Sequence, residues 1–170
     1  MQTIKFNAEI GVNKGYNVDE NQKETLGIEA IGKLLQDKAE TIYTSDGFYK
    51  GVYISTIVTG PDRTVYRVPE WGCPVGGELT YNISGTANPT FGVDPLAWKI
   101  AALALVNKMR TALKQTTVAV EFTDQDGIDF YYLNSKEAFK DSVKQILQKE
   151  VEKGRSPQDI EKYTDIFEKE

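Results

Sequence analysis

Apolar and polar residues alternate at the start of the chain and then change to a helical spacing. In the segment 3–12, TIKFNAEIGV, every second residue from Ile4 to Ile10 is apolar, and this period of two predicts a strand. Apolar residues in the following segment recur three or four positions apart up to about Lys38, and this period predicts an amphipathic helix. A strand followed by a helix is therefore the first unit of the fold.

Turn and capping residues set the expected ends of these elements. Asp19 followed by Gln22 predicts an N-cap with a capping-box partner at the start of the helix. Gly27 and Gly32 would either weaken that helix or permit close packing against it. Asp46–Gly47 is a turn signal between two β-rich runs, and a further short strand is predicted after the next turn.

The same order begins again at Glu78. The segment 77–85, GELTYNISG, predicts a strand, and Asp94–Pro95 predicts an N-cap with proline at the first helical position. The helix that follows, 95–115, is rich in Ala and Leu and apolar almost all round, so we expect it to be the more buried of the two helices. The segments TTVAVEF and GIDFYYL then predict two strands joined by a turn.

Strand, helix and strand thus occur twice, in two halves whose residue identities barely match. Two βαβ units in one sheet predict an α+β fold, namely a ferredoxin-like antiparallel sheet with two helices on one face. We assign residues 1–134 to this duplicated βαβ domain and the segment 68–77 to the crossover between its halves.

Residues 135–170 are expected to form a C-terminal appendage of two amphipathic helices. Ser135 predicts the N-cap of the first helix, Gly154 its end, and Ser156–Pro157 the start of a second, shorter helix. Each helix has one apolar face and is thickly charged elsewhere. Either the open face of the sheet or another subunit would cover those apolar faces.

Composition and charge place the chain among ordinary globular proteins. Hydrophobic residues make up 40% and charged residues 26%, far from the composition of disordered chains. The net charge of -5, with a pI near 4.9, disfavours nucleic acid as a partner, because phosphate binding needs clustered Lys and Arg. No signal peptide is evident, and the longest apolar stretch, around 100–106, is far shorter than the roughly 20 residues of a membrane span. With a single Cys and therefore no internal disulfide, these features predict a cytoplasmic protein without a membrane partner.

The chain contains no histidine, which limits the chemistry that it can perform. Ser-His-Asp and Cys-His catalysis and histidine metal sites are excluded. Cys73 has no histidine to activate it, so a structural thiol is the simpler interpretation, and the spacing of Glu70 and Glu78 in a loop fixes no carboxylate pair. No glycine pattern matches a nucleotide-binding loop. We therefore assign no catalytic residue, no metal site and no cofactor.

Aromatic residues interleave with basic ones in the middle of the chain. The basic residues are Lys50, Arg63 and Arg67, and the aromatic ones are Phe48, Tyr49, Tyr53, Tyr66, Trp71 and Tyr81. A planar ligand with a phosphate or carboxylate group would use this mixture, with rings for stacking and guanidinium groups for the anion. The alternative is core packing and cross-strand pairing of the rings. The segment 68–78 is likewise either part of a site or a plain connector.

Two short segments resemble those of a known family. Tyr49–Gly51 follows the first helix and Gln115–Val118 follows the second, in the places where the phage proteins that degrade S-adenosylmethionine have a tyrosine-glycine and a glutamine-Ser/Thr-valine segment. Over about residues 3–133 the layout resembles those proteins, which are built of two βαβ halves and assemble as oligomers with ligand pockets at subunit boundaries. The family places a catalytic glutamate after the tyrosine-glycine segment, but here residues 52–55 read VYIS, without a carboxylate.

The resemblance and the missing carboxylate favour a binding protein over an enzyme. We expect a phage or mobile-element accessory protein, a homo-oligomer in the host cell cytoplasm, that holds a small adenosine-containing or nucleotide-like ligand in a subunit-interface pocket. Phages use small oligomeric proteins to sequester nucleotide-like defence signals, so counter-defence is one role for such a pocket. The residues expected to bind the ligand are Tyr49, Tyr53, Arg67, Trp71 and Gln115.

Two alternatives stay open. In the first, the chain is an S-adenosylmethionine lyase in which Glu78 or Glu24 takes the role of the missing carboxylate. In the second, it is a structural, virion or protein-interaction module, because a pair of amphipathic helices commonly docks in the groove of a partner.

Overall fold

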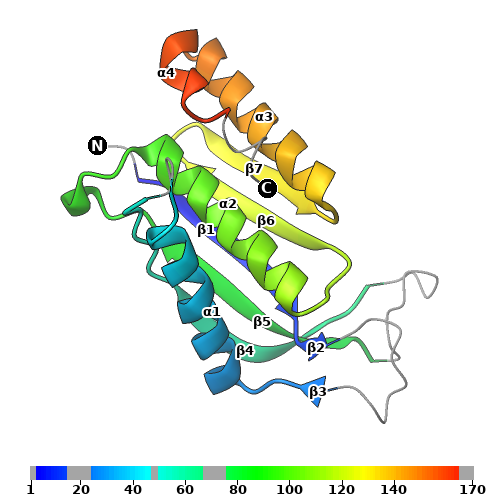
Figure 1. Cartoon of the computed structure of the whole chain (residues 1–170). Coiled ribbons are helices and arrows are strands. Elements are labelled where there is room, and N and C mark those ends of the chain that lie inside the picture. Colours follow the sequence, from blue (N-terminus) through cyan, green and yellow to red (C-terminus); the bar gives the residue numbers. More distant parts are fainter. Residues whose placement is uncertain (1–2, 15–23, 47–49, 67–75, 165–170) are drawn as a thin grey trace.

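The computed structural model describes residues 3–14, 24–46, 50–66 and 76–164. These residues form a five-stranded main sheet, a small two-stranded sheet and one layer of helices (Figure 1). The elements in chain order are β1 (Lys5–Gly11), β2 (Asn13–Lys14), β3 (Glu24–Thr25), α1 (Ile28–Tyr43), β4 (Ile57–Thr64), β5 (Glu78–Thr86), the 3-10 helix η3 (Pro89–Phe91), α2 (Pro95–Ala112), β6 (Val118–Asp124), β7 (Gly127–Leu133), α3 (Lys136–Glu152) and α4 (Pro157–Glu161).

The main sheet has the strand order β4-β5-β1-β6-β7, with every neighbouring pair antiparallel. Since β1 and β4 both run antiparallel to β5, they are parallel to each other, and α1 connects them. In the same way β5 and β6 are parallel, and α2 connects them. This is the split βαβ arrangement of ferredoxin-like proteins, with β7 added at one edge. The predicted fold class is confirmed.

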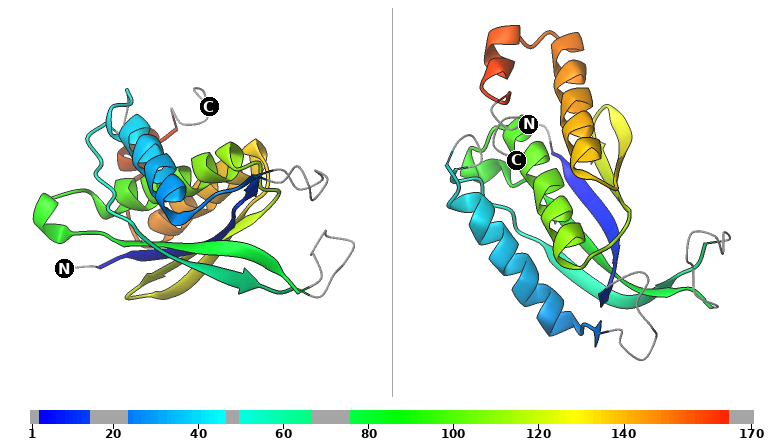
Figure 2. Two further views of the ribbon diagram at one scale, coloured as in Figure 1. Left: turned by 90° about the horizontal axis from the view of Figure 1, so that it is seen from below. Right: turned by 45° about the vertical axis from the view of Figure 1, so that its right-hand side comes forward.

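All the long helices lie on one face of this sheet (Figure 2). Helix α2 lies between α1 and α3, and α3 also packs against β7. The apolar stripe of α3 is thus buried inside the chain, at Phe139, Val143, Ile146 and Leu147. The sequence suggested the open face of the sheet or a second subunit as the cover for this stripe, whereas α3 extends the existing helical layer. The domain boundary after residue 134 stays a prediction.

The core fills the space between the sheet and the helices. Alternate residues of β1, from Ile4 to Ile10, are buried, as their period of two predicts. Helix α2 buries twelve residues, whereas α1 buries only Ile31, Leu35 and Ile42. The expectation that the second helix is the more buried one is confirmed. None of the described helices is long and apolar enough to cross a membrane.

The boundaries of the first helix differ from those predicted. Helix α1 has Gly27 as its N-cap and continues to Tyr43, because Ile42 prolongs the buried stripe of Ile31 and Leu35 by a further two turns. The predicted capping pair, Asp19 and Gln22, lies outside the described residues, and the short strand β3 precedes the helix. The β-rich run before Asp46 is therefore the last turn of α1 rather than a strand.

Candidate ligand-binding groove

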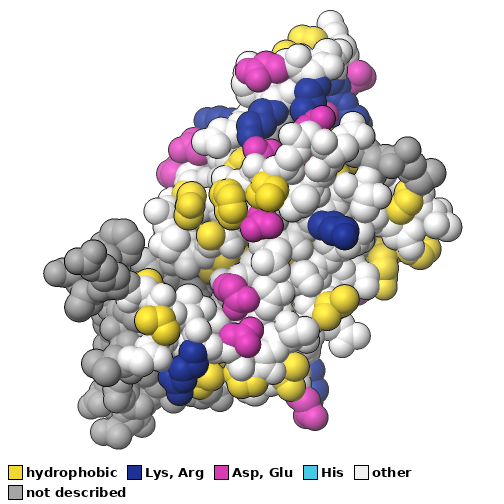
Figure 3. Space-filling model, turned by 180° about the vertical axis from the view of Figure 1, so that it is seen from behind, with side chains coloured by type: hydrophobic (Ala, Val, Ile, Leu, Met, Phe, Trp, Pro, Cys, Tyr) yellow, Lys and Arg dark blue, Asp and Glu magenta, His cyan; other side chains and the backbone are white. Residues whose placement is uncertain are grey.

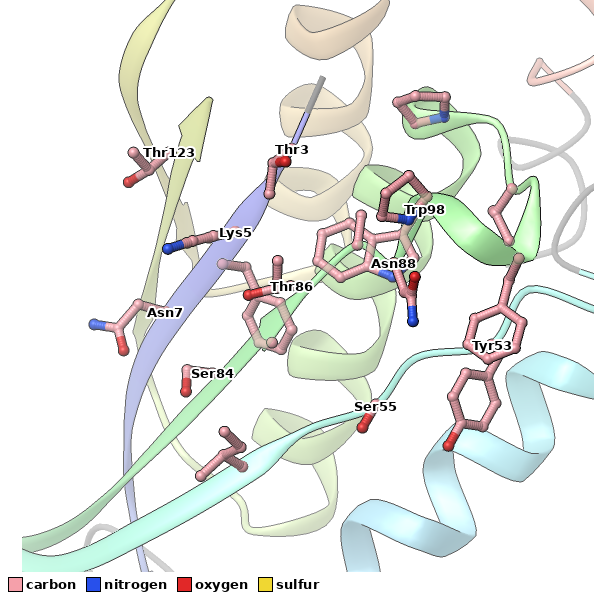
Figure 4. A pocket seen from close by; sticks show the side chains of 18 of the residues that line it. Thr3, Lys5, Asn7, Tyr53, Ser55, Ser84, Thr86, Asn88, Trp98 and Thr123 are labelled. Carbon is pink, nitrogen blue, oxygen red and sulfur yellow. The ribbon is translucent and has the colours of Figure 1, made fainter. Parts of the chain in front are cut away.

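Two hollows open beside the segment that leads from α1 into β4. The larger one, here called the main groove, has a volume of about 1080 Å³ and lies between the starts of β1 and α2, the end of β5, and η3 (Figure 4). The smaller one, here called the side groove, has a volume of about 860 Å³ and lies between α1 and residues 51–58. Both volumes are large enough to hold a nucleoside-sized ligand.

An aromatic pair forms a wall that the two grooves share. Tyr53 and Phe91 line both of them. Their ring centroids lie 5.8 Å apart at an interplanar angle of 65°, the edge-to-face arrangement that aromatic rings prefer. Tyr53 is 54% exposed and Phe91 62% exposed. The other described residues therefore leave a large part of each side chain uncovered, where a ligand can make contact. These rings give the groove an exposed aromatic surface.

Local capping explains why η3 presents Phe91 at this place. Pro89 occupies the start of the 3-10 helix, and the side chain of Asn88 accepts a hydrogen bond from the Thr90 N–H at 3.0 Å. Gly92 then takes a left-handed conformation with φ of 61°, which only glycine adopts at little cost and which turns the chain towards α2. The ring of Phe91 therefore stands at the tip of a well-defined turn.

The floor of the main groove is apolar. It contains Phe6 from β1 and Trp98 from α2, whose ring centroids lie 5.9 Å apart. Both side chains are almost fully buried, so each offers the groove only an edge.

Polar side chains extend the main groove onto the uncovered face of the sheet. They come from β5, β1 and β6, where Lys5 pairs with Thr86 and Thr123, and Asn7 pairs in register with Ser84 and Glu121. Figure 4 shows the side chains of Lys5, Asn7 and Thr123 on the side of the sheet away from Trp98. Figure 3 shows this uncovered face, with acidic side chains along its middle and hydrophobic side chains in separate groups. The groove thus has an aromatic end and a charged, polar end.

Asp94 is the most heavily engaged acidic group in the main groove. Its carboxylate accepts hydrogen bonds from the Leu96 N–H at 3.1 Å, from Arg155 Nη2 at 3.1 Å and from the Tyr163 hydroxyl at 2.5 Å. Partial burial raises the pKa of Asp94, but these hydrogen bonds and the charge of Arg155 outweigh burial and lower it overall. Burial, together with the bond to Asp94, raises the pKa of the Tyr163 hydroxyl. Asp94 is therefore an ionised structural anchor at the groove rim.

The structure brings Tyr53 into the groove but places Gln115 elsewhere. Gln115 is buried at the opposite end of β1. Its side chain lies against Gly11 there, since a Cβ atom added to Gly11 would be 2.3 Å from Gln115 Oε1. The length of β1 between Lys5 and Gly11, about 20 Å, separates this position from the main groove. Contact of Gln115 with a ligand stays a prediction. The other predicted ligand residues, Tyr49, Arg67 and Trp71, lie outside the described residues, as does Cys73.

Of the two carboxylates considered for catalysis, the described one, Glu78, does not line the main groove. Residues 52–55 alternate between buried and exposed and contain no acidic side chain. Glu78 lies beside Gly11 at the far end of β1, and the side chain of Glu24 is outside the description. The acidic residues that the structure does place at the main groove are Asp94 and Glu121. The described residues contain no cluster of metal-binding side chains.

Sequence reasoning missed most of the groove residues, among them Lys5, Phe91, Trp98 and Glu121. Phe91 lay in a segment interpreted as a loop, and Trp98 matched the apolar pattern of a core helix. Lys5 and Glu121 occupy the polar positions of alternating strands, where exposed charge is ordinary. The only available signal was that both belong to strands predicted to share one sheet.

The fold is that of a ferredoxin-like α+β protein, with a groove that opens onto the uncovered face of its sheet. A family model, that of the SAM lyases, matches residues 1–134, so the chain belongs to the SAM lyase family, and the predicted resemblance is confirmed. Among solved structures it is similar to a phage SAM lyase in complex with S-methyl-5'-thioadenosine, at 18% identity and a TM-score of 0.51, over 79% of this chain and 91% of that chain. A phage SAM lyase in its apo state matches at 16% identity with a TM-score of 0.47, over 78% and 90% of the two chains. No curated protein matches the sequence.

Proposed function

We propose that this chain is a phage or mobile-element accessory protein that binds a small adenosine-containing molecule of the S-adenosylmethionine type in the main groove. The observation that carries the proposal is the exposed wall of Tyr53 and Phe91, which stands between two nucleoside-sized hollows. Family membership supports it, and the similar phage enzyme was solved with a methylthio-nucleoside. An exposed aromatic ring can stack on any nucleobase, because every base has a flat π-face.

The polar end of the groove suits the amino-acid part of such a ligand. An α-amino carboxylate carries one positive and one negative charge. Lys5 and Glu121 offer the complementary pair from neighbouring strands, with Asn7 and Thr123 as neutral partners. The base would lie against the rings at the other end. This arrangement uses both ends of the groove and requires no catalytic group.

The proposed pocket lies between subunits of a homo-oligomer. The main groove opens onto the uncovered face of the sheet, where a second copy would exclude water from a bound ligand. Sequestration of a nucleotide-like defence signal is the role that fits a pocket without chemistry.

Calorimetric titration tests the proposal. Wild-type protein is expected to release or absorb heat with S-adenosylmethionine, S-methyl-5'-thioadenosine or a cyclic nucleotide signal. Phe91→Ala should raise the Kd about tenfold or more, since stacking of a base on a ring contributes about 1–3 kcal/mol. Ile28→Ala is the control, because Ile28 is 44% exposed on α1 and lines neither groove. Absence of heat with every ligand would contradict the proposal.

Cleavage of S-adenosylmethionine is the second candidate function, favoured by family membership and by the position of Glu121 in the main groove. Incubation with the substrate, followed by chromatography for methylthioadenosine, separates the two candidates. A binding protein leaves the substrate peak unchanged. A lyase depletes it, and Glu121→Gln would then slow the depletion if this carboxylate contacts the reacting molecule.

A further inference from the structure

The C-terminal segment returns to the rim of the main groove. Tyr163, which follows α4, is 1% exposed, and its hydroxyl donates a hydrogen bond to Asp94 Oδ2 at 2.5 Å. Arg155, between α3 and α4, donates from Nη2 to the other carboxylate oxygen, Oδ1, at 3.1 Å. Asp94 lines the main groove. Lys162 also forms an ion pair with Asp94 Oδ2, at 3.8 Å, so three residues of the C-terminal segment contact one groove residue.

Asp94 also fixes one end of the segment 87–94, which carries Phe91. Its side chain caps α2 through the Leu96 N–H. At the other end of this segment, the Ala87 N–H donates to the carbonyl oxygen of Ile4, the residue before β1, at 2.8 Å. Between these two anchors the chain crosses η3, and Gly92 provides the turn next to Phe91. A displacement of Asp94 would therefore move the ring that faces Tyr53.

We propose that Tyr163 and Arg155 are positioning residues for the ligand groove, which hold Asp94 so that Phe91 stays beside Tyr53. This inference rests on the proposed function of the groove. The family model matches residues 1–134, and both positioning residues lie beyond that match. Affinity for the ligand thus depends on a segment outside the part of the chain that the family model matches.

The C-terminal segment has a second attachment, remote from the groove. This attachment serves as a control, because it distinguishes a positioning role at the groove from a general contribution to stability. Lys149 donates to Asp129 Oδ1 at 2.5 Å, and Lys153 pairs with Asp126 at 2.7 Å. These contacts fasten α3 to the β6–β7 hairpin, and none of these four residues lines the main groove. If the C-terminal segment merely stabilises the fold, weakening either attachment should have the same effect on binding.

The test compares Tyr163→Phe with Lys149→Met in the full chain. Tyr163→Phe keeps the buried ring and removes the hydrogen bond to Asp94, and Lys149→Met removes the remote ion pair. The Kd for S-methyl-5'-thioadenosine is measured by calorimetry, and amide hydrogen exchange of residues 88–94 is measured without ligand. We expect Tyr163→Phe to raise the Kd about fivefold or more and to speed the exchange, within the usual range of coupling between sites. Lys149→Met should change neither. Arg155→Met, a second variant, should act in the same direction as Tyr163→Phe.

Each remaining outcome decides the inference. An unchanged Kd for Tyr163→Phe, or an equal rise for Lys149→Met, overturns it. If the wild type binds neither S-methyl-5'-thioadenosine nor the other ligands titrated above, the proposed function fails, and the exchange measurement alone then decides the positioning role. Faster exchange at residues 88–94 in Tyr163→Phe but not in Lys149→Met supports that role, and equal exchange in all variants refutes it.

Discussion

Helices α1 and α2 hold equivalent places in the two βαβ halves, yet they differ greatly in burial. Of 16 residues in α1 three are buried, whereas α2 buries twelve of 18. The difference follows from the helical layer, because α2 has α1 on one side and α3 on the other, and α1 lies at the edge. Position within the layer, rather than position within the repeat, therefore sets how apolar each helix must be.

The two helices also differ in how they border the grooves. The free flank of α1, with residues 51–58, forms the side groove, and Tyr53 from this segment reaches the main groove as well. Helix α2 contributes little more than its first turn to the main groove, through Pro95 and Trp98. The second half thus supplies most of the core, whereas both halves line the main groove, to which the second half contributes the end of β5 and η3.

The largest expected effect breaks the core of the second half. Leu103 on α2 is fully buried, so Leu103→Ala should lower the free energy of unfolding by about 2–5 kcal/mol through lost contacts and a cavity. Leu34→Ala on α1 is the matched change, and it should cost only about 1 kcal/mol because Leu34 is partly buried. Urea unfolding of both variants measures the difference. Equal losses would show that the two helices contribute alike, contrary to the comparison above.

A tight backbone contact gives the next effect. A Cβ atom on Gly85 of β5 would lie 2.7 Å from both Phe6 and the Ser55 carbonyl oxygen, so the strand or the segment leading into β4 must shift. Gly85→Ala should therefore destabilise the protein by about 1–3 kcal/mol. The neighbouring Ser84→Ala, whose side chain points to the uncovered face, should be nearly neutral. Thermal unfolding of the two variants compares them, and a neutral Gly85→Ala would show that this contact yields easily.

Periodicity predicted most of the sheet and the helical layer, because each strand and helix has one buried face. It was misleading between Tyr43 and Ile57, where Val52 and Ile54 are buried while Tyr53 and Ser55 are exposed. That alternation is the pattern of a strand, yet residues 50–56 have no pairing partner and β4 begins only at Ile57. A pattern of burial reports which side chains face the core, and it carries no information on backbone pairing.

The groove was only partly predictable. Tyr53 stood out because aromatic residues in that region interleave with basic ones. The contact of Tyr163 with Asp94 joins residues far apart in the sequence, and it depends on how α4 returns to the start of α2. No local pattern encodes such a meeting. Long-range polar contacts of this kind emerge only once the layers are assembled.

Asp94, the N-cap of α2, gives a prediction of how the stability of the protein changes at low pH. The pKa of Asp94 is lowered in the folded protein, so its ionised form stabilises the fold above the unfolded pKa, near 3.8, and this stability is lost as the pH falls through the lower, folded value. The stability difference between wild type and Asp94→Asn should therefore be constant from pH 7 to about 4.5 and shrink towards pH 3. Urea midpoints across this range measure it. A difference that does not vary with pH would mean that the charge of Asp94 is irrelevant to its contacts with Arg155, Lys162 and Tyr163.

Helix α1 should tolerate an added methyl group at Gly32. A Cβ atom on Gly32 meets nothing within 4 Å, so close packing does not explain this glycine. Gly32→Ala should raise the free energy of unfolding by about 0.5–1 kcal/mol, because alanine loses less backbone entropy in a helix. Gly51→Ala is the control, since its surroundings are equally open but its φ of 76° strains any side chain, and it should destabilise. The same sign for both substitutions would contradict the interpretation.

The smallest effect concerns the N-caps of the helices. Helices α2 and α3 begin with side-chain caps, Asp94 and Ser135, whereas α1 begins at Gly27 without one. Gly27 has an extended backbone, with φ of -80° and ψ of 170°, and open space around it, so serine fits there without strain. Gly27→Ser should stabilise the protein by a few tenths of a kcal/mol, and Ser135→Gly should cost about as much. If chemical denaturation shows no gain for Gly27→Ser while Ser135→Gly is destabilising, the start of α1 is held by its neighbours β2 and β3, and capping does not limit it.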